Sequence, residues 1–188
     1  TNKEKQLFKK TKPWGIILFS RNIKNLSQLK ILTNDIKKIL RDKNYPILID
    51  QEGGKVSRLN KIIDLSLFSQ YSFGKLYNKN KKLFYIVYKI YIDKVCGIFK
   101  QVGININTAP VLDVIRRKTP NFIGSRSFSQ NSESVSKLGK LCIDLYKKNR
   151  IATVVKHIPG HGMTKHDSHY KTPIITTNRK ELFKKDFK

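Results

Sequence analysis

The chain has few of the residues that would stabilise a small secreted protein or a membrane-spanning one. It contains two cysteines in 188 residues, Cys96 and Cys142, and both lie among apolar residues at helical spacing. They are therefore expected to be reduced core residues, not parts of a disulfide framework. No apolar run reaches the ~20 residues that a membrane-spanning helix needs, and no signal-peptide pattern is visible. Residue 1 is Thr, so we expect the natural N-terminus to lie upstream.

Acidic residues are scarce, with 13 Asp and Glu against 39 Lys and Arg, and the formal net charge is +26. Such a charge is typical of nucleic-acid-binding proteins, but here 31 lysines outnumber eight arginines and are spread along the whole chain. Ala occurs only twice, whereas Ile occurs 23 times and Asn 14 times, which is the pattern of an AT-rich genome. We therefore expect the charge to reflect codon usage. No specific nucleic acid partner is expected, only a salt-sensitive affinity for polyanions.

Histidine is absent outside one short segment, since all four histidines fall within the 13 residues 157–169. Because histidine exchanges protons near neutral pH, this concentration favours a catalytic loop. The β-branched run 151–155 precedes the segment, and Pro159 and Gly160 interrupt any regular structure within it. A strand that ends in a reactive loop is typical of α/β enzymes.

Apolar periodicity predicts strands that alternate with helices. The expected strands cover 14–19, 47–49, 104–108 and 151–155. The expected helices cover 26–40, 83–99, a segment that Ser132 caps and that extends to 145, and a last segment that Asn178 caps and that runs to 188. The stretch 60–82 is less regular.

This alternation predicts a parallel sheet. The second strand ends near Asp50, the third near Asn107 and Asp113, and the fourth at Lys156 and His157. Polar groups at the same end of successive strands fit a (β/α)₈ barrel of TIM type. An open doubly wound sheet would show the same feature, but its glycine-rich nucleotide fingerprint is absent, and we interpret 53–55 as a tight turn. Since a full barrel needs ~250 residues, the chain is expected to be a fragment that covers roughly the first half.

Five sequence blocks resemble, in the same order, those of glycoside hydrolase family 3, specifically its bacterial β-N-acetylglucosaminidases (β-N-acetylhexosaminidases) of peptidoglycan recycling. The blocks are GIILFSRN (15–22), DQEGGKVSRL (50–59), APVLDV (109–114), GSRSF (124–128), and KHIPGHG (156–162) followed by DSH (167–169). They cover almost the whole chain, so residues 1–188 are expected to form one partial catalytic barrel of this family. Met163 and Ser125 stand where the family often has acidic residues.

The resemblance implies an enzyme that removes terminal β-linked N-acetylglucosamine from peptidoglycan-derived sugars with retention of configuration. It implies that His169 is the general acid/base and that Asp167 orients it. It also implies five sugar-binding residues: Asp50, Arg58, Arg126, Lys156 and His157. The nucleophilic aspartate of the family lies on a later loop, beyond residue 188, so the isolated chain is expected to be inactive. A carbohydrate partner, no cofactor, no membrane and a cytoplasmic location are implied as well.

Several alternatives to this interpretation stay open. His157 and His161 have the i, i+4 spacing of a zinc-binding helix, but Pro159 and Gly160 exclude that helix, so no metal is expected. His166 is expected to be a bystander and His161 to shape the loop. The chain would otherwise be an inactive half-barrel remnant or a basic polyanion-binding protein.

The acidic residues of the second and third loops also allow two interpretations. Asp50 and Glu52 could form a catalytic carboxylate pair, whereas the resemblance makes Asp50 a sugar-binding residue and Glu52 a structural residue of the turn. Asp113 could also be a turn residue, and no role is assigned to it.

Overall fold

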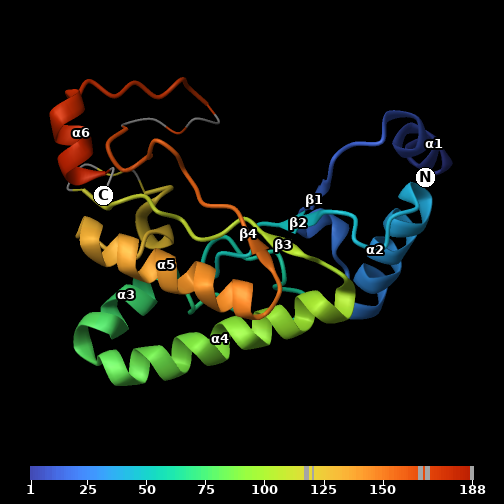
Figure 1. Ribbon diagram of the computed structural model, residues 1–188, viewed down its shortest axis with the longest axis horizontal. Helices are drawn as coiled ribbons and strands as arrows, with labels where there is room; N and C mark the ends of the chain where they lie inside the picture. The colour runs from blue at the N-terminus through green and yellow to red at the C-terminus, as the bar shows by residue number, and fades with distance from the viewer. Residues whose placement is uncertain (117–118, 120, 165–166, 168–169, 187–188) are drawn as a thin grey trace.

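The computed structural model describes residues 1–116, 119, 121–164, 167 and 170–186. Its strands and helices alternate along the chain, as the periodicity predicts (Figure 1). The elements in chain order are α1 (Asn2–Thr11), β1 (Ile16–Leu18), the 3₁₀ helix η1 (Ser20–Asn22), α2 (Leu26–Leu40), β2 (Ile47–Ile49), α3 (Gln70–Lys79), α4 (Lys81–Val102), β3 (Ile106–Asn107), the 3₁₀ helix η2 (Gly124–Arg126), α5 (Ser132–Lys148), β4 (Ala152–Thr153) and α6 (Arg179–Lys185).

The four strands form one parallel sheet in the order β1-β2-β3-β4. Ile47 pairs with Ile16, Leu48 pairs with Ile106, and Ile106 pairs with Ala152. Each strand thus lies beside the one that precedes it in the chain, whereas the strand order of a doubly wound sheet reverses at a switch point. The fold is α/β, in the arrangement of the first half of a TIM-type barrel, and the carboxyl ends of all four strands lie along one edge.

Helices α4 and α5 lie side by side, and α2 packs near the C-terminal end of α4 (Figure 1). The hydrophobic core contains large side chains that are almost fully buried, and burying such a side chain stabilises a fold by about 1.5–3 kcal/mol. The largest of them are Tyr88, Tyr146, Phe84, Phe99 and Phe128. Cys96 on α4 and Cys142 on α5 are free and buried in the same core, as predicted.

The abundant asparagines serve as helix caps. Asn25, Asn80, Asn131 and Asn178 each accept a hydrogen bond from the N–H of the third residue of the helix that follows, at 2.8–3.0 Å. The cap predicted at Asn178 is confirmed. The cap predicted at Ser132 is wrong by one residue: Ser132 is already helical, because the side chain of Asn131 reaches the N–H that needs a partner.

The structure differs from the sequence prediction in the lengths of several elements. Helix α3 lies within the stretch that was expected to be irregular, and α1 is an additional helix at the N-terminus. Strands β3 and β4 have two residues each, where five were predicted. One reason is that side chains replace part of the backbone ladder, since the N–H of Ile47 donates to Oδ1 of Asn105 at 2.8 Å.

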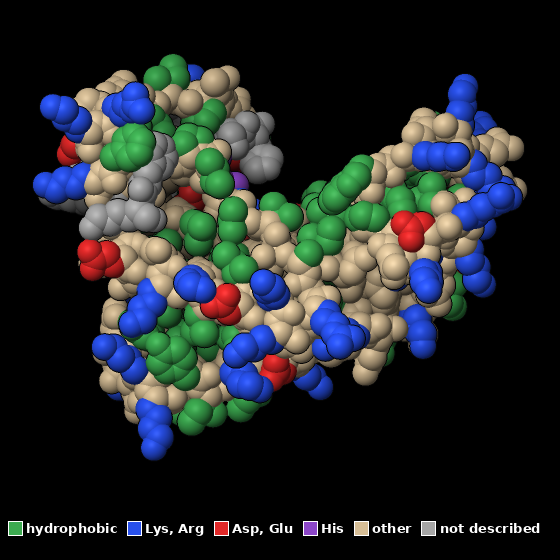
Figure 2. All heavy atoms as spheres, viewed as in Figure 1, with side chains coloured by type: hydrophobic (Ala, Val, Ile, Leu, Met, Phe, Trp, Pro, Cys, Tyr) green, Lys and Arg blue, Asp and Glu red, His purple; other side chains and the backbone are tan. Residues whose placement is uncertain are grey.

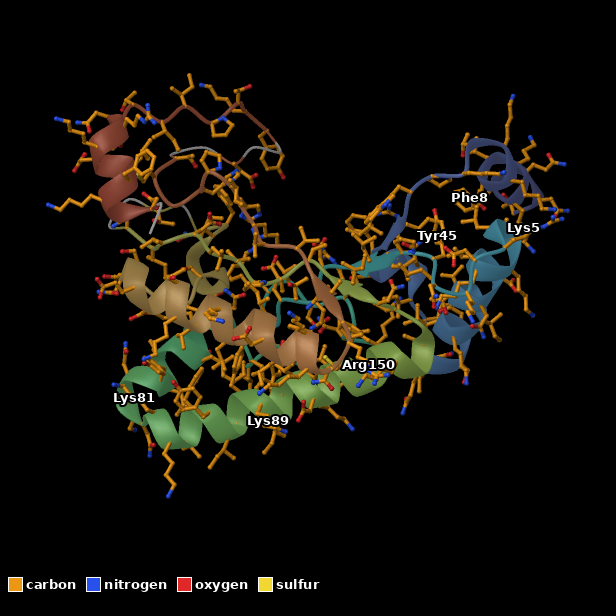
Figure 3. The ribbon with its side chains drawn as sticks, viewed as in Figure 1. Lys5, Phe8, Tyr45, Lys81, Lys89 and Arg150 are labelled. Carbon is orange, nitrogen blue, oxygen red and sulfur yellow. The ribbon has the colours of Figure 1, made fainter. Side chains whose placement is uncertain are left out.

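Helices α1 and α2 form an arm at the N-terminal end, and α6 with the segment before it forms a lobe at the other end (Figure 1). Phe8 and Tyr45 lie on the arm, where the Tyr45 hydroxyl donates to the carbonyl of Pro13 (Figure 3). The surface is hollowed between the arm and the lobe (Figure 2). None of the helices in the described part of the chain is both long and apolar enough to cross a membrane.

Candidate active site

The carboxyl ends of β2, β3 and β4 bring the first candidate residues together. The N–H of Thr108 donates to the carbonyl of Ile49 at 2.9 Å, which sets the end of β3 beside Asp50. The Thr108 hydroxyl donates to Oδ1 of Asp50, and Nζ of Lys156 lies 2.9 Å from the same oxygen. Three residues from three successive strand ends therefore meet at one carboxylate, as a TIM-type catalytic face requires.

Asp50 is held in its charged form. Burial alone would raise the pKa of this carboxyl, but the hydrogen bond from Thr108 and the positive charges of Lys156 and Arg58 outweigh burial and lower it. Nη2 of Arg58 lies 3.4 Å from Oδ2 of Asp50. The side chains of Asp50 and Arg58 remain 18% and 26% exposed, so the ionised carboxylate can still accept hydrogen bonds from a ligand.

Glu52 forms ion pairs with two of the candidate cations, Arg126 and Lys156. Its carboxylate accepts Nε of Arg126 at 2.8 Å and Nη2 at 2.9 Å, and Nζ of Lys156 lies 2.6 Å from Oε1. The Glu52 side chain is only 1% exposed. Burial would lower the pKa of Arg126, but the hydrogen bonds and the charge of Glu52 outweigh burial and raise it. The interpretation of Glu52 as a structural residue fits these contacts, although its partners extend well beyond its own turn.

Asp113 completes the arrangement from the third loop. Its fully buried carboxylate lies 2.6 Å from Nδ1 of His157 through Oδ2, and it accepts the N–H of His161 at 2.7 Å through Oδ1. The other ring nitrogen of His157, Nε2, lies 3.3 Å from Nη2 of Arg126. Asp113 is therefore a partner of the histidine loop, a contact that the sequence alone does not predict.

These contacts join into one network across the loops after β2, β3 and β4, in which acidic and basic groups alternate from Arg58 to Arg126 and the His157–Asp113 pair adjoins Arg126. We call it the charge network, and its members in order of contact are Arg58, Asp50, Lys156, Glu52, Arg126, His157 and Asp113. It contains all five residues that the sequence predicts to bind sugar. From Arg58 to Arg126 the neighbouring charges attract, and hydrogen bonds join His157 and Asp113 to them, so the side chains are held in fixed positions before any ligand arrives.

The loop after β2 owes its shape to Gln51, which is fully buried. Oε1 of Gln51 accepts the N–H groups of Arg58 and Leu59 at 2.9 and 3.1 Å, and Nε2 donates to Oγ of Ser57 at 2.9 Å. Gly53 has φ = +88°, and a Cβ there would lie 2.1 Å from the carbonyl oxygen of Phe68. The tight turn predicted at 53–55 is confirmed, and it returns the chain so that Asp50 and Arg58 meet.

Of the predicted catalytic pair on the loop after β4, the structure describes Asp167 only. His169, the predicted acid/base, lies outside the described residues, and so does His166. The backbone carbonyl of Asp167 accepts the N–H groups of Tyr170 and Lys171 at 3.1 and 3.0 Å. The contact between Asp167 and His169 therefore stays a prediction.

His161 packs behind His157, with ring centroids 4.7 Å apart. Burial lowers the pKa of His161, which favours the neutral form of this side chain. A neutral, partly buried imidazole whose backbone N–H is bound to Asp113 fits the expectation that His161 shapes the loop.

Within the described part of the chain, Asp113, His157 and His161 form a group with potential metal ligands within 4.8 Å of one another. Both ring nitrogens of His157 are already engaged otherwise, because Nδ1 faces Asp113 and Nε2 faces the Arg126 guanidinium. A divalent ion would have to replace the contact between Nδ1 of His157 and Asp113, and it would lie next to the positive charge of Arg126. The group is therefore arranged as a hydrogen-bonded Asp–His pair, and we assign it no metal.

Asp113 was assigned no role from the sequence, although the structure places it in contact with His157 and His161. The available signal was its position, since it is a lone acidic residue between apolar neighbours, Leu112 and Val114, shortly after a predicted strand. Such a carboxylate becomes buried when its neighbours pack into the core, and a buried carboxylate needs partners.

Known proteins resemble this chain in sequence and in fold. The sequence matches the glycosyl hydrolase family 3 N terminal domain over residues 1–188. It is 33% identical over 180 residues to Beta-hexosaminidase A of Pseudoalteromonas piscicida, covering 92% of this chain and 29% of that protein. It is also 33% identical over 184 residues to the Beta-hexosaminidase of Neisseria meningitidis serogroup C (strain 053442), covering 97% of this chain and 50% of that protein.

Among solved structures, the fold matches NagZ from Neisseria gonorrhoeae in complex with N-trifluoroacetyl-D-glucosamine, with a TM-score of 0.87 and 31% identity. That match covers 99% of this chain and 54% of the NagZ chain. The chain thus spans about half the length of these relatives, or less. Since the domain match extends over the whole sequence, the chain belongs to glycosyl hydrolase family 3 and represents its N terminal domain.

Proposed function

We propose that the protein that contains this chain hydrolyses terminal β-linked N-acetylglucosamine from peptidoglycan-derived sugars by a retaining mechanism. The observation that carries the proposal is the charge network, in which Asp50, Arg58, Arg126, Lys156 and His157 converge at the carboxyl ends of the strands. The names of the similar proteins, beta-hexosaminidase and NagZ, support the same chemistry. Residues 1–188 would form one partial catalytic barrel.

In this proposal the charge network binds one sugar and orients its anomeric carbon. Asp50 accepts hydrogen bonds from hydroxyl groups, while Arg58 and Lys156 donate to sugar oxygens. These side chains are held by one another before binding, so the entropic cost of ordering them is reduced when the sugar arrives. The substrate would be a carbohydrate, with no cofactor, no specific nucleic acid and no membrane as partners, and the location would be cytoplasmic.

His169 is proposed as the general acid/base, with Asp167 as the residue that orients it. A carboxylate beside an imidazole fixes its tautomer and stabilises the imidazolium that protonates the departing oxygen. The nucleophile would be an aspartate outside residues 1–188, and it would form the covalent glycosyl intermediate of a retaining glycosidase. A polypeptide of residues 1–188 alone would therefore be inactive.

The acid role is tested in the natural full-length protein with His169→Ala. Turnover of N-acetylglucosaminides with a poor alkyl leaving group should fall by about 10²–10⁴-fold, whereas an activated aryl leaving group needs little protonation and should be affected far less. The matched control is His166→Ala, which removes a histidine three positions earlier and should leave both substrates unaffected. Equal losses on both substrates would contradict the role of His169.

Sugar binding is tested separately with Lys156→Met, which keeps the length of the side chain and removes its charge. Affinity for N-acetylglucosamine, measured by calorimetry on the full-length protein, should fall by about tenfold or more. Lys140→Met is the control, because Lys140 is 77% exposed and pairs with Asp144 one turn further along α5. Unchanged affinity in Lys156→Met would contradict the proposal that the charge network binds the sugar.

A further inference from the structure

Asp113 and His157 form the innermost contact of the charge network. The Asp113 side chain has no exposed surface, whereas the His157 side chain is 27% exposed. The two residues are brought together by the backbone, because the N–H of Leu112 donates to the carbonyl of Lys156 at 2.6 Å and extends the pairing of β3 with β4. The pairing of the strands therefore sets the positions of the two residues, and their side chains are short.

The chemistry of the partners determines which nitrogen of His157 carries its proton. A carboxylate can only accept, so Nδ1, which lies 2.6 Å from Oδ2 of Asp113, must carry a hydrogen. A guanidinium can only donate, so Nε2, which lies 3.3 Å from Nη2 of Arg126, must present its lone pair. His157 is therefore the neutral Nδ1–H tautomer, which free histidine side chains favour less than the Nε2–H form.

Asp113 also holds the surrounding loops in place. Its Oδ1 accepts the N–H of His161 at 2.7 Å, and its backbone carbonyl accepts the hydroxyl of Ser127, the neighbour of Arg126. Both oxygens of the buried carboxylate are therefore used, one for the side chain of His157 and one for the loop that follows. This pattern resembles a carboxylate that orients a functional histidine, not an isolated buried charge.

We propose that Asp113 is a positioning residue that fixes His157 as the Nδ1–H tautomer and so keeps His157 and Arg126 in hydrogen-bonded contact in the sugar site. Without Asp113 the imidazole can place a hydrogen on Nε2, where it faces the Arg126 guanidinium with donor against donor. The part of this inference that concerns sugar binding rests on the proposed function. The tautomer of His157 does not depend on it.

The first test is ¹⁵N NMR of histidine-labelled full-length protein at a pH where imidazoles are neutral, with His157→Gln used to assign the signals of His157. In the wild type, Nδ1 should show the signature of a protonated nitrogen and Nε2 that of an unprotonated one. In Asp113→Ala the populations should shift toward the Nε2–H form, and Asp144→Asn, which changes an exposed carboxylate, should leave them as they were. An Nε2–H tautomer in the wild type would overturn the proposal.

The second test is a double-mutant cycle on the KM for an aryl N-acetylglucosaminide, using Asp113→Asn, which preserves the shape of the side chain, and His157→Gln. If Asp113 acts through His157, Asp113→Asn should raise KM about tenfold in the wild type and less than about twofold in the His157→Gln background. Equal effects in both backgrounds would show a merely structural role and overturn the proposal. If the wild type shows the Nδ1–H tautomer but hydrolyses no N-acetylglucosaminide, the proposed function fails while the assignment of Asp113 stands.

Discussion

Glu52 and Arg126 are 74 positions apart in the chain and are joined by two parallel hydrogen bonds, from Nε to Oε2 at 2.8 Å and from Nη2 to Oε1 at 2.9 Å. This geometry matches the planar fork of the guanidinium to the two oxygens of the carboxylate, which makes it a strong type of ion pair. The pair connects the loop after β2 with η2, and it leaves Glu52 only 1% exposed. It therefore links the stability of the fold to the shape of the candidate site.

Substitution of Glu52 should destabilise the protein strongly. In Glu52→Gln the Arg126 and Lys156 cations lose their shared buried counter-charge, and we expect the free energy of unfolding to fall by about 3 kcal/mol. The measurement is urea unfolding of the full-length protein at neutral pH. Asp144→Asn serves as the control, because its pair with Lys140 is exposed and should change stability by no more than about 0.5 kcal/mol. A similar small effect of both substitutions would contradict the importance of the buried pair.

The ion pairs of Asp50 should make stability fall in acid. The pKa of Asp50 is lowered below its ordinary value of 3.8, because Thr108, Lys156 and Arg58 together outweigh the effect of burial. A lowered pKa in the folded state means that the stabilisation is fully present above pH ~3.8 and is lost as the pH falls through the folded pKa. The free energies of unfolding of the wild type and Asp50→Asn should therefore differ most near neutral pH and converge below pH ~3.8. A constant difference across this range would contradict the assignment.

Much of the fold could be predicted because its signals are local. The apolar spacing of residues 26–40 matches α2, whose bounds are Leu26–Leu40, and the short run 47–49 matches β2. Helix α3 was not predicted, because its segment contains Gly74 among aromatic and polar residues and so has low intrinsic helix propensity. Its stability comes from packing, since Phe73 and Tyr77 are buried against α4, and a single sequence does not contain that information.

The candidate site could be predicted only where sequence blocks identified residues directly. Asp50, Lys156 and His157 were found in that way, and the structure brings them together. The role of Asp113 could not be found, because its contact with His157 spans 44 positions and depends on the register between β3 and β4. Contacts of this kind are set by strand pairing, and that register is not visible in the local pattern of either strand.

The two cysteines should be unreactive in the native protein. Burial raises the pKa of Cys96 to about 12 and that of Cys142 to about 12, so almost no thiolate exists at neutral pH and neither sulfur is accessible. Iodoacetamide should modify neither residue in the native state and both in denaturant, which mass spectrometry would show. Ser66→Cys, at an exposed loop position, is the positive control and should be alkylated rapidly in the native protein. Rapid native labelling of Cys96 or Cys142 would show that the core between α4 and α5 opens readily.

Two helical glycines should respond oppositely to substitution by alanine. A Cβ on Gly74 in α3 would lie 1.9 Å from the carbonyl oxygen of Phe128, so α3 can approach the segment after η2 only if residue 74 has no side chain. For Gly97 in α4, no atom of the described residues other than its chain neighbours and the adjacent helix backbone lies within 4 Å of the position of a Cβ. We expect Gly74→Ala to lower the free energy of unfolding by about 1–3 kcal/mol through overpacking, and Gly97→Ala to raise it by about 0.5–1 kcal/mol through helix propensity.

Urea unfolding of both glycine variants of the full-length protein measures the difference directly. The two substitutions add the same methyl group to a helix interior, so propensity alone predicts stabilisation in both cases. Opposite signs would show that the position of α3 against Phe128 is fixed by backbone contact.

The position of α3 also affects the candidate site, because Nε2 of Gln70 on α3 donates to the carbonyl of Val111 at 2.9 Å and its Oε1 accepts the Val111 N–H at 3.0 Å. A displaced α3 would therefore move the loop that carries Asp113, and Gly74→Ala should weaken N-acetylglucosamine binding as well as stability, whereas Gly97→Ala should leave binding unchanged. Stabilisation by Gly74→Ala with unaltered binding would contradict this coupling.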